Sequence, residues 1–309
     1  MAVRTRLPRT WSWPGSHVLA VTIGVPFEAF QYQSQFNYIA TPGKKDLLSL
    51  SYADYGWKAG VWRLLDLLDR FDAKASMATN GLAAERHPHI VKTFIDNGHE
   101  VMGHGWANDV YVKDAGEEAE RAEIRRCTQI LTEASGGVRP VGWTSPGSTG
   151  SEHTIRLLKE EGYLWNGDDL SDDLPFVVES GAGPFVMMPR QSLATNDITH
   201  WMFSRNAPSV MWEGFKDTFD ALYAEAKEGA ARSIDITLHA HMAGRPTLIP
   251  SIERMLGYAR QHDGVYFTRK RDMAEWALKQ AAAVELPGTC GPLPSEGRVY
   301  GTPKSFGGP

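Results

Sequence analysis

Long apolar runs, clusters of basic residues and paired cysteines are all missing from this sequence of 309 residues. No apolar stretch approaches the roughly 18 to 20 residues that a membrane-spanning helix needs, so no membrane span is expected. The 32 lysines and arginines are outnumbered by 37 aspartates and glutamates, which gives a net charge of −5. Nucleic acid and anionic membrane surfaces are therefore not expected as partners.

Cysteine is scarce, with Cys127 and Cys290 as the only two residues of this type. Cys127 lies in a helical pattern and Cys290 in a segment rich in proline and glycine, so we expect neither a structural disulfide nor a thiolate metal site. Residues 1–14 lack the apolar stretch of a secretion signal. These features together predict a cytoplasmic location.

The hydrophobic residues, 42% of the chain, fall into alternating strand-like and helix-like segments. The expected strands are 18–25, 74–79, 100–103, 140–143, 163–166, 185–188, 233–238 and 265–267. The expected helices are 57–71, 88–97, 117–135, a helix to residue 161 that opens on a capping box of Thr149 and Glu152, 212–227, 251–262 and 272–284. Seven or eight β–α alternations predict an α/β fold, a parallel, barrel-like (β/α) structure formed by residues 1–284 as a single domain.

Two segments fall outside this alternation. Residues 31–55 form a long polar and aromatic insertion after the first expected strand, either a lid over the strand ends or an Ω-loop. Residues 285–309 are dense in proline and glycine and show no periodicity, so they form a C-terminal extension. This extension is either a frayed tail or an arm that wraps a neighbouring subunit.

Two of the expected strands end on histidine. The segment 98–111 carries His104 and several polar residues directly after its strand, and His239 follows the strand 233–238. In α/β architectures, sites are built from the loops at the carboxyl ends of the strands. We therefore expect His104 and His239 to meet at one mouth of the barrel, and we give His241 the lesser weight.

Five segments between about Trp13 and Trp276 carry motifs in a fixed order. They are Tyr55-Gly-Trp-Lys-Ala-Gly-Val-Trp-Arg-Leu-Leu65, Gly98-His-Glu-Val-Met-Gly-His-Gly-Trp106, Arg139-Pro-Val-Gly-Trp143, Asp168-Asp-Leu-Ser-Asp-Asp-Leu-Pro175, and Leu238-His239 with Gly244-Arg245-Pro246. This order resembles the polysaccharide deacetylase (NodB-like) superfamily, and the Gly-Trp pair resembles its cofactor-independent allantoinase-like branch. The resemblance implies a distorted barrel that cleaves carbon–nitrogen bonds and assembles into a homo-oligomer.

The chain departs from the metal site that this resemblance implies. Typical members bind a divalent metal through an aspartate after the first strand and two histidines spaced four apart. Here the segment after the first strand ends on Glu28, and Asn108 stands four residues after His104. Because an amide is a much poorer zinc ligand than imidazole, no metal and no other cofactor are expected. The alternative is a single zinc ion held by Glu28, His104 and His239.

Amide hydrolysis without a metal needs a base, an acid and a donor for the developing oxyanion. His104 is the expected base, since an ordinary imidazole accepts a proton near neutral pH. Glu28 orients His104 or shares its role, unless it is a solvated loop acid. His239 is the expected acid, and the alternative is a histidine that is hydrogen-bonded within the core.

The remaining candidates are expected to bind the substrate. Trp106 and Trp143 would form flat apolar walls, or else pack in the core. Asn108 and Asp109 would exchange hydrogen bonds with the substrate, although Asn-Asp is also an ordinary turn. One acid of the segment 168–173, Asp169, is assigned the same role. Arg245 would clamp an anionic group, or else bond to carbonyls of its own loop.

Three functions remain open on these grounds. The leading hypothesis is a metal-independent hydrolase of a small amide, ureide, N-acetyl or N-formyl compound. The second is a metal-dependent carbohydrate N-deacetylase with an altered site. The third is a barrel that binds saccharide or a small amide without cleaving it. The allantoinase-like branch has an arginine soon after its Gly-Trp pair, where this chain reads Thr144-Ser-Pro-Gly-Ser148, so allantoin itself is not assigned as the substrate.

Overall fold

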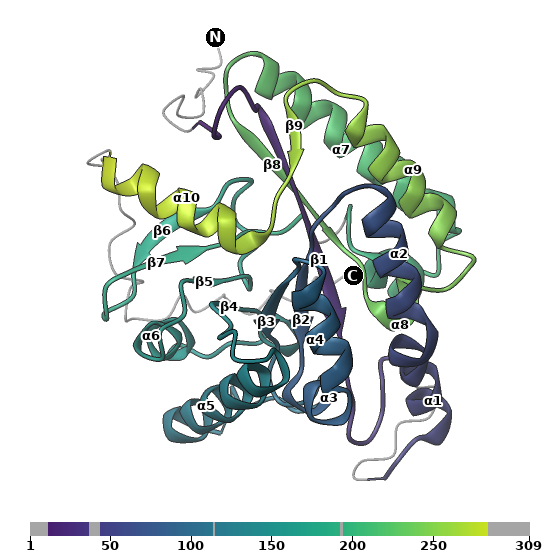
Figure 1. Ribbon diagram of the computed structural model, residues 1–309, viewed down its shortest axis with the longest axis vertical. Coiled ribbons are helices and arrows are strands. Elements are labelled where there is room, and N and C mark those ends of the chain that lie inside the picture. Colours follow the sequence, from purple (N-terminus) through teal and green to yellow (C-terminus); the bar gives the residue numbers. More distant parts are fainter. Residues whose placement is uncertain (1–11, 37–43, 114, 192–193, 284–309) are drawn as a thin grey trace, which may run out of the picture.

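The computed structural model describes residues 12–36, 44–113, 115–191 and 194–283, and in these residues nine strands form one curled sheet (Figure 1). The strands are β1 (Leu19–Phe27), β2 (Ser76–Thr79), β3 (Glu100–Gly103), β4 (Gly142–Trp143), β5 (Trp165–Asn166), β6 (Phe176–Glu179), β7 (Pro184–Met187), β8 (Arg232–Thr237) and β9 (Val265–Phe267). Their order is β6-β7-β5-β4-β3-β2-β1-β8, and β9 also pairs with β1. All pairings are parallel except β6 with β7. The predicted α/β fold of the distorted barrel type is confirmed.

The curled sheet differs from a closed barrel at its two ends. Strands β6 and β8 end the pairing order, and no ladder joins them within the described residues. Helix α10 (Lys270–Ala283) instead packs against β6 and β7. The chain therefore forms an open half-barrel with one side completed by a helix.

The other helices surround the sheet (Figure 1). They are α1 (Leu47–Tyr55), α2 (Val61–Arg70), α3 (Gly81–Arg86), α4 (Pro88–Asp96), α5 (Glu117–Ala134), α6 (Thr154–Glu160), α7 (Pro208–Lys227), α8 (Ala240–Ala243) and α9 (Ile249–Arg260), with short irregular helices η1 (Gly56–Gly60), η2 (Pro146–Ser148) and η3 (Ile198–Phe203). In α2, Leu64, Leu67 and Leu68 are buried at helical spacing. This apolar stripe holds the helix against the sheet.

The structure corrects two local predictions. The described part of the insertion at 31–55 is not a plain Ω-loop, because it contains α1, which Asp46 caps by accepting from the amides of Leu48 and Ser49. The helix expected from the capping box begins only at Thr154. The Thr149 hydroxyl donates to the carbonyl of Pro146 instead, 2.8 Å away, and closes a short turn.

The strands place alternate residues on the two faces of the sheet. Along β1, Leu19, Val21 and Ile23 join the large core between the sheet and the helices. Ala20 belongs to a second cluster inside the curl, with Trp165 of β5 and Met273 of α10. Because side chains alternate with a period of two, every second residue points into the half-barrel.

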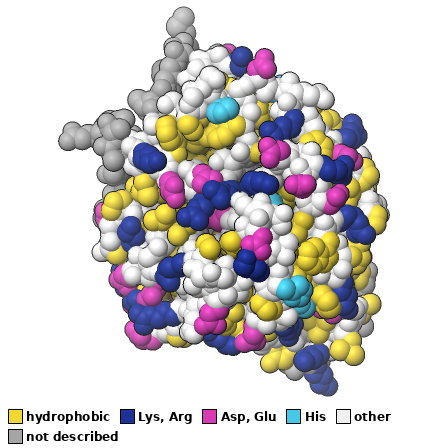
Figure 2. Space-filling view, in the orientation of Figure 1, with side chains coloured by type: hydrophobic (Ala, Val, Ile, Leu, Met, Phe, Trp, Pro, Cys, Tyr) yellow, Lys and Arg dark blue, Asp and Glu magenta, His cyan; other side chains and the backbone are white. Residues whose placement is uncertain are grey.

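The charge distribution on the surface and the length of the helices bear on whether nucleic acid or membrane could be a partner. Basic and acidic side chains are interspersed over the face in Figure 2. In the part of the chain that the structure describes, no helix is both long and apolar enough to cross a bilayer. Cys127 is a buried free thiol, whereas Cys290 and the extension 285–309 lie outside the described residues.

Candidate active site

The candidate site is a row of side chains that follow the strand ends. The sheet register aligns Phe27 with Thr79, Thr79 with Gly103, and Gly103 with Trp143. The next residues along the chain are Glu28, Asn80, His104 and Thr144. Since they lie one residue beyond an aligned set, they share the inward face of the half-barrel. The alternation of the strands thus explains why these polar residues meet.

Asn80 ties two members of this row together. Its side chain is fully buried, accepts from the backbone N–H of Ala29 at 3.0 Å, and donates through Nδ2 to the backbone carbonyl of His104. The chain segments that carry Glu28 and His104 are thereby held at a fixed separation.

The tautomer of His104 follows from its neighbours. Its Nδ1 lies 2.6 Å from the backbone carbonyl oxygen of Thr144, which can only accept a hydrogen bond. Nδ1 therefore carries a hydrogen, and Nε2 points toward Glu28, with 3.3 Å between Nε2 and Oε1. The neutral ring presents an unprotonated Nε2 to the site, and Nε2 can donate to a carboxylate at Glu28 only when the ring is protonated.

His239 is fixed by a buried carboxylate, Asp197. One oxygen of Asp197 accepts from the His239 backbone N–H at 2.7 Å, and the other lies 2.6 Å from Nδ1. His239 Nε2 then faces Glu28, 3.7 Å from Oε1. This is the arrangement in which a carboxylate holds one imidazole nitrogen and directs the other at a reacting group.

Glu28 lies at the centre of three histidines. Its side chain is 1% exposed, so it is not the solvated loop acid that the sequence left open. Oε1 contacts both His104 and His239, and Oε2 lies 3.7 Å from Nδ1 of His241. His241 is near the site because the chain turns into α8 directly after His239. The sequence pattern favours His104 and His239 over His241, and so does not predict the contact of His241 with Glu28.

The electrostatics assign different protonation states to these groups. Burial alone would raise the pKa of Glu28, but His239, His104 and His241 outweigh it and lower the pKa from 4.5 to about 2. Burial would lower the pKa of His239, yet Asp197 and Glu28 raise it. Burial lowers the pKa of His241 to about 4, so this ring is neutral at neutral pH. Burial also raises the pKa of Asp197, and the charge and the two N–H groups of His239 act in the opposite direction.

Replacing Glu28 by glutamine is expected to make stability less sensitive to acid. The shift from 4.5 to about 2 corresponds to on the order of 3 kcal/mol in the free energy of unfolding. Because the folded pKa lies below the unfolded one, this contribution is complete above pH 4.5 and is lost as the pH falls toward 2. Urea unfolding at about pH 6 and about pH 3 should show a wild-type advantage over Glu28→Gln that shrinks in acid. Parallel pH profiles would contradict the lowered pKa.

A cavity of about 350 Å³ opens at this row. Its walls include the predicted residues Glu28, His104, Asn108 and His239, which the structure therefore brings together. Lys270 also lines this cavity, lies 2.9 Å from the carboxylate of Asp235, and is buried together with it. At the rim, Tyr111, Leu170 and Phe203 expose large apolar surfaces.

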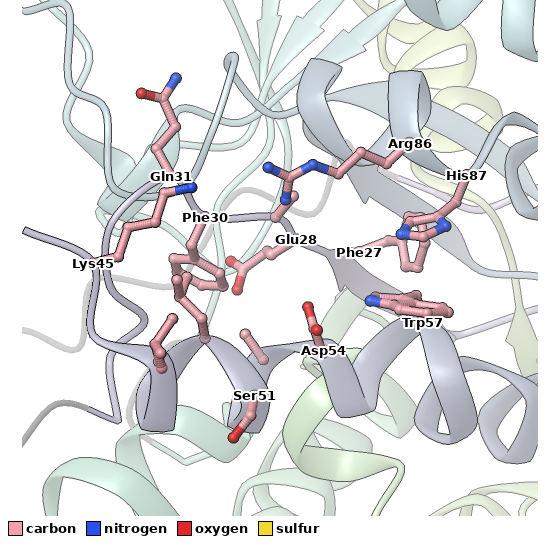
Figure 3. Close-up of a pocket in the computed structure, with 14 residues that line it drawn as sticks. Phe27, Glu28, Phe30, Gln31, Lys45, Ser51, Asp54, Trp57, Arg86 and His87 are labelled. Atoms are coloured by element: carbon pink, nitrogen blue, oxygen red, sulfur yellow. The ribbon is translucent and has the colours of Figure 1, made fainter.

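A second cavity, of about 450 Å³, lies between the loop after β1 and helix α1. Figure 3 shows Glu28 within it, with Lys45, Asp54 and Arg86 around the same space. Glu28 thus forms part of the wall of both cavities. The insertion at 31–55 contributes to each, because Gln35 lines the first and Lys45 the second.

The two predicted tryptophans do not line the cavity of His104 and His239. Trp106 packs against α5, where the guanidinium of Arg126 lies 3.4 Å from its ring centroid. The ring of Trp143 covers Gly103, at which an added Cβ would come within 2.3 Å of the ring. Both tryptophans are buried and pack against their neighbours, which was the alternative role expected for them.

The other three predicted binding residues also lie outside that cavity. Asp109 accepts from the backbone amides of three residues of the insertion, Gln31, Tyr32 and Gln33. Asp169 accepts from Ser171 in its own loop. Arg245 donates to the backbone carbonyls of His241 and Tyr52 and stacks over Tyr52 at 4.0 Å. These acids and this arginine hold loops in the structure.

Sequence reasoning missed Asp197, Asn80 and Arg190. Asn80 and Arg190 follow the ends of β2 and β7, so the rule that found His104 could have found them. Asp197 carries no such signal. It caps the irregular helix η3, where its side chain accepts from the amide of Ile198, and it meets His239 only through the fold.

The donor set does not fit the expected alternative of a zinc site. In residues 12–36, 44–113, 115–191 and 194–283, no group of three or more histidines, cysteines, aspartates and glutamates has the spacing of metal ligands. The position that a second histidine would fill holds Asn108, whose Oδ1 is buried without a hydrogen-bond partner.

The chain is similar to known deacetylases and to an allantoinase. The family model described as polysaccharide deacetylase matches residues 40–164. The crystal structure of PuuE allantoinase superposes with a TM-score of 0.80 at 29% identity, covering 91% of this chain and 95% of that one. A Schizosaccharomyces pombe protein assigned to the polysaccharide deacetylases is 26% identical over 73% of this chain and 75% of its own length. The peptidoglycan deacetylase of Helicobacter pylori is 21% identical over 73% of this chain and 86% of its own length.

These matches confirm the predicted superfamily and the reaction class. They include both deacetylases and an allantoinase, enzymes that cleave carbon–nitrogen bonds outside peptides. The chain is similar to the polysaccharide deacetylase superfamily and to its allantoinase-like branch, and is a hydrolase of carbon–nitrogen bonds.

Proposed function

We propose that the chain hydrolyses a small amide or ureide without a metal, using His104 and Glu28 to activate water and His239 as the acid. One observation carries this proposal: Oε1 of Glu28 lies 3.3 Å from Nε2 of His104 and 3.7 Å from Nε2 of His239. The Nδ1 atom of each ring is engaged elsewhere. Two oriented imidazoles at one carboxylate supply both a base and an acid.

The first step is attack of water on the carbonyl carbon of the substrate. Nε2 of His104 accepts a proton from the water while its oxygen bonds to carbon. The imidazolium that forms is stabilised by the ionised Glu28 and by the carbonyl of Thr144. The carboxamide of Asn108 lines the same cavity and can donate to the oxyanion.

The second step breaks the carbon–nitrogen bond. Nε2 of His239 donates a proton to the departing nitrogen, which leaves as an amine while the carbonyl group is restored as an acid. The raised pKa of His239 favours the protonated form that this step needs. Because Oε1 of Glu28 contacts both rings, it can return the proton from His104 to His239, and one water is consumed.

The proposal is tested with a panel of ureides, cyclic imides, formamides and N-acetyl sugars. Release of the amine and of the acid is measured for each compound with the purified full chain. We expect turnover of at least one small amide or ureide, with both products in equal amounts. Calorimetric binding without any product would favour the non-catalytic alternative.

Chelation is expected to leave the rate unchanged. The described residues provide no cluster of metal ligands, so removal of divalent ions should not affect the proposed base or acid. The rate is measured before and after prolonged dialysis against EDTA, with elemental analysis of protein that carries no polyhistidine tag. Stoichiometric zinc, together with a rate that chelation abolishes and zinc restores, would favour the metal-dependent alternative.

Three expectations about domain organisation, assembly and location stay predictions. The single domain of residues 1–284, the homo-oligomer and the cytoplasmic location each await a direct measurement. Analytical ultracentrifugation of the full chain would determine the oligomeric state.

A further inference from the structure

Arg190 is a cationic residue of the cavity to which the proposed mechanism gives no role. It follows the end of β7 and is mostly buried. Its side chain lines the same cavity as His239 and Ser148. A guanidinium is charged at every pH at which the protein is folded, so it contributes a permanent positive charge to the site.

The hydrogen-bonding groups of Arg190 are incompletely satisfied. Its Nη2 donates to the hydroxyl of Ser148, whereas its buried Nε has no acceptor in the described part of the chain. Asp168 acts on Arg190 electrostatically, but its own oxygens accept from the Ser145 amide at 2.8 Å and from Asn166 at 2.9 Å. Because a buried donor without a partner is costly, an acceptor on a ligand would stabilise this side chain.

Ser148 adds a second donor on the same wall. Its backbone has a φ of +56°, a left-handed conformation that is unfavourable for a residue with a Cβ. Such strained residues cluster at sites where a side chain must be held in place. Since the Ser148 oxygen accepts from Arg190, its own hydrogen is available to a ligand.

We infer that Arg190 and Ser148 bind a carboxylate of the substrate, so that the enzyme prefers small amides or ureides that carry an acid group. A guanidinium with a free N–H matches the geometry and the charge of a carboxylate oxygen. The hydrolytic part of this inference rests on the proposed function. The binding part does not, because it follows from Arg190 and Ser148 alone.

The preference is measured with matched pairs that differ only in charge. N-carbamoylglycine is compared with N-carbamoylglycinamide, and N-acetylglycine with N-acetylglycinamide. We expect wild-type kcat/KM to favour the acid of each pair by about 10- to 100-fold, the range for a hydrogen bond to a charged group. Arg190→Gln should bring this ratio close to one, and Arg190→Lys should give an intermediate ratio.

A matched control and a binding measurement separate the possible failures. Arg125→Gln removes the same charge from the surface, where Arg125 pairs with Glu161, and should keep the wild-type preference. Calorimetry with succinate should show binding that Arg190→Gln weakens by about 10-fold or more. If succinate binds in this way but no amide is cleaved, the proposed function fails and the carboxylate site stands. Equal succinate binding by both proteins, or no preference for acids by an active wild type, would overturn the inference.

Discussion

Replacing His104 by alanine is expected to lower kcat by about 10²- to 10⁴-fold, the range contributed by one general acid–base side chain. The variant loses the Nε2 that lies 3.3 Å from Oε1 of Glu28 and that carries no hydrogen in the neutral ring. The thermal unfolding midpoint should stay nearly unchanged. Thr144 lines the cavity, so water can take the place of the lost N–H at its carbonyl, and Asn80 bonds to the backbone of residue 104.

His153→Ala is the matched control for this variant. His153 lies at the start of α6, partly exposed and outside both cavities, so its loss should leave kcat at the wild-type value. The two variants are compared on the compound that wild type turns over fastest, with circular dichroism to verify folding. A His104→Ala protein with wild-type kcat would exclude His104 as the base.

Strand alternation is a local property, so the sequence could predict which residues come together at the centre of the candidate site. Glu28, His104 and His239 each stand at or just beyond the end of an apolar strand, and parallel strands bring such ends together at one edge of a sheet. Strand alternation does not predict which residues of the loop after a strand line the cavity. Asp109 and Asn108 are neighbours in the loop after β3, yet Asn108 lines the cavity and Asp109 binds backbone amides of the insertion.

Residues whose role depends on distant partners could not be predicted in this way. Arg245 is a residue type that could bind an anion. Its guanidinium instead donates to the backbone carbonyl of Tyr52 and stacks on the ring of Tyr52, a residue 193 positions earlier in the chain. Asp197 is 42 positions from the histidine that it orients. Neither contact leaves a periodic trace in the sequence, because each depends on how separate elements pack.

Replacing Asp197 by asparagine is expected to reduce kcat by about 10²-fold or more, because it disturbs the proposed acid. Asp197 accepts from both the backbone N–H and Nδ1 of His239. An asparagine carries only one acceptor oxygen, so its NH₂ group would face one of these two donors. The ring of His239 would then lose its fixed tautomer or its orientation.

The pH profile distinguishes this role from a merely structural one. Burial lowers the pKa of His239, whereas Asp197 and Glu28 raise it, with Asp197 the larger of the two. Since the protonated ring is the active form, the rate falls as the pH rises through this pKa. Asp197→Asn should therefore move the alkaline limb of the kcat profile to lower pH, because the pKa of His239 falls with the loss of the negative charge. Asp220→Asn, which removes the same charge from a surface pair with Lys216, should leave the limb in place. If the Asp197→Asn protein is less stable but its alkaline limb lies at the wild-type pH, Asp197 supports the fold and does not set the pKa of His239.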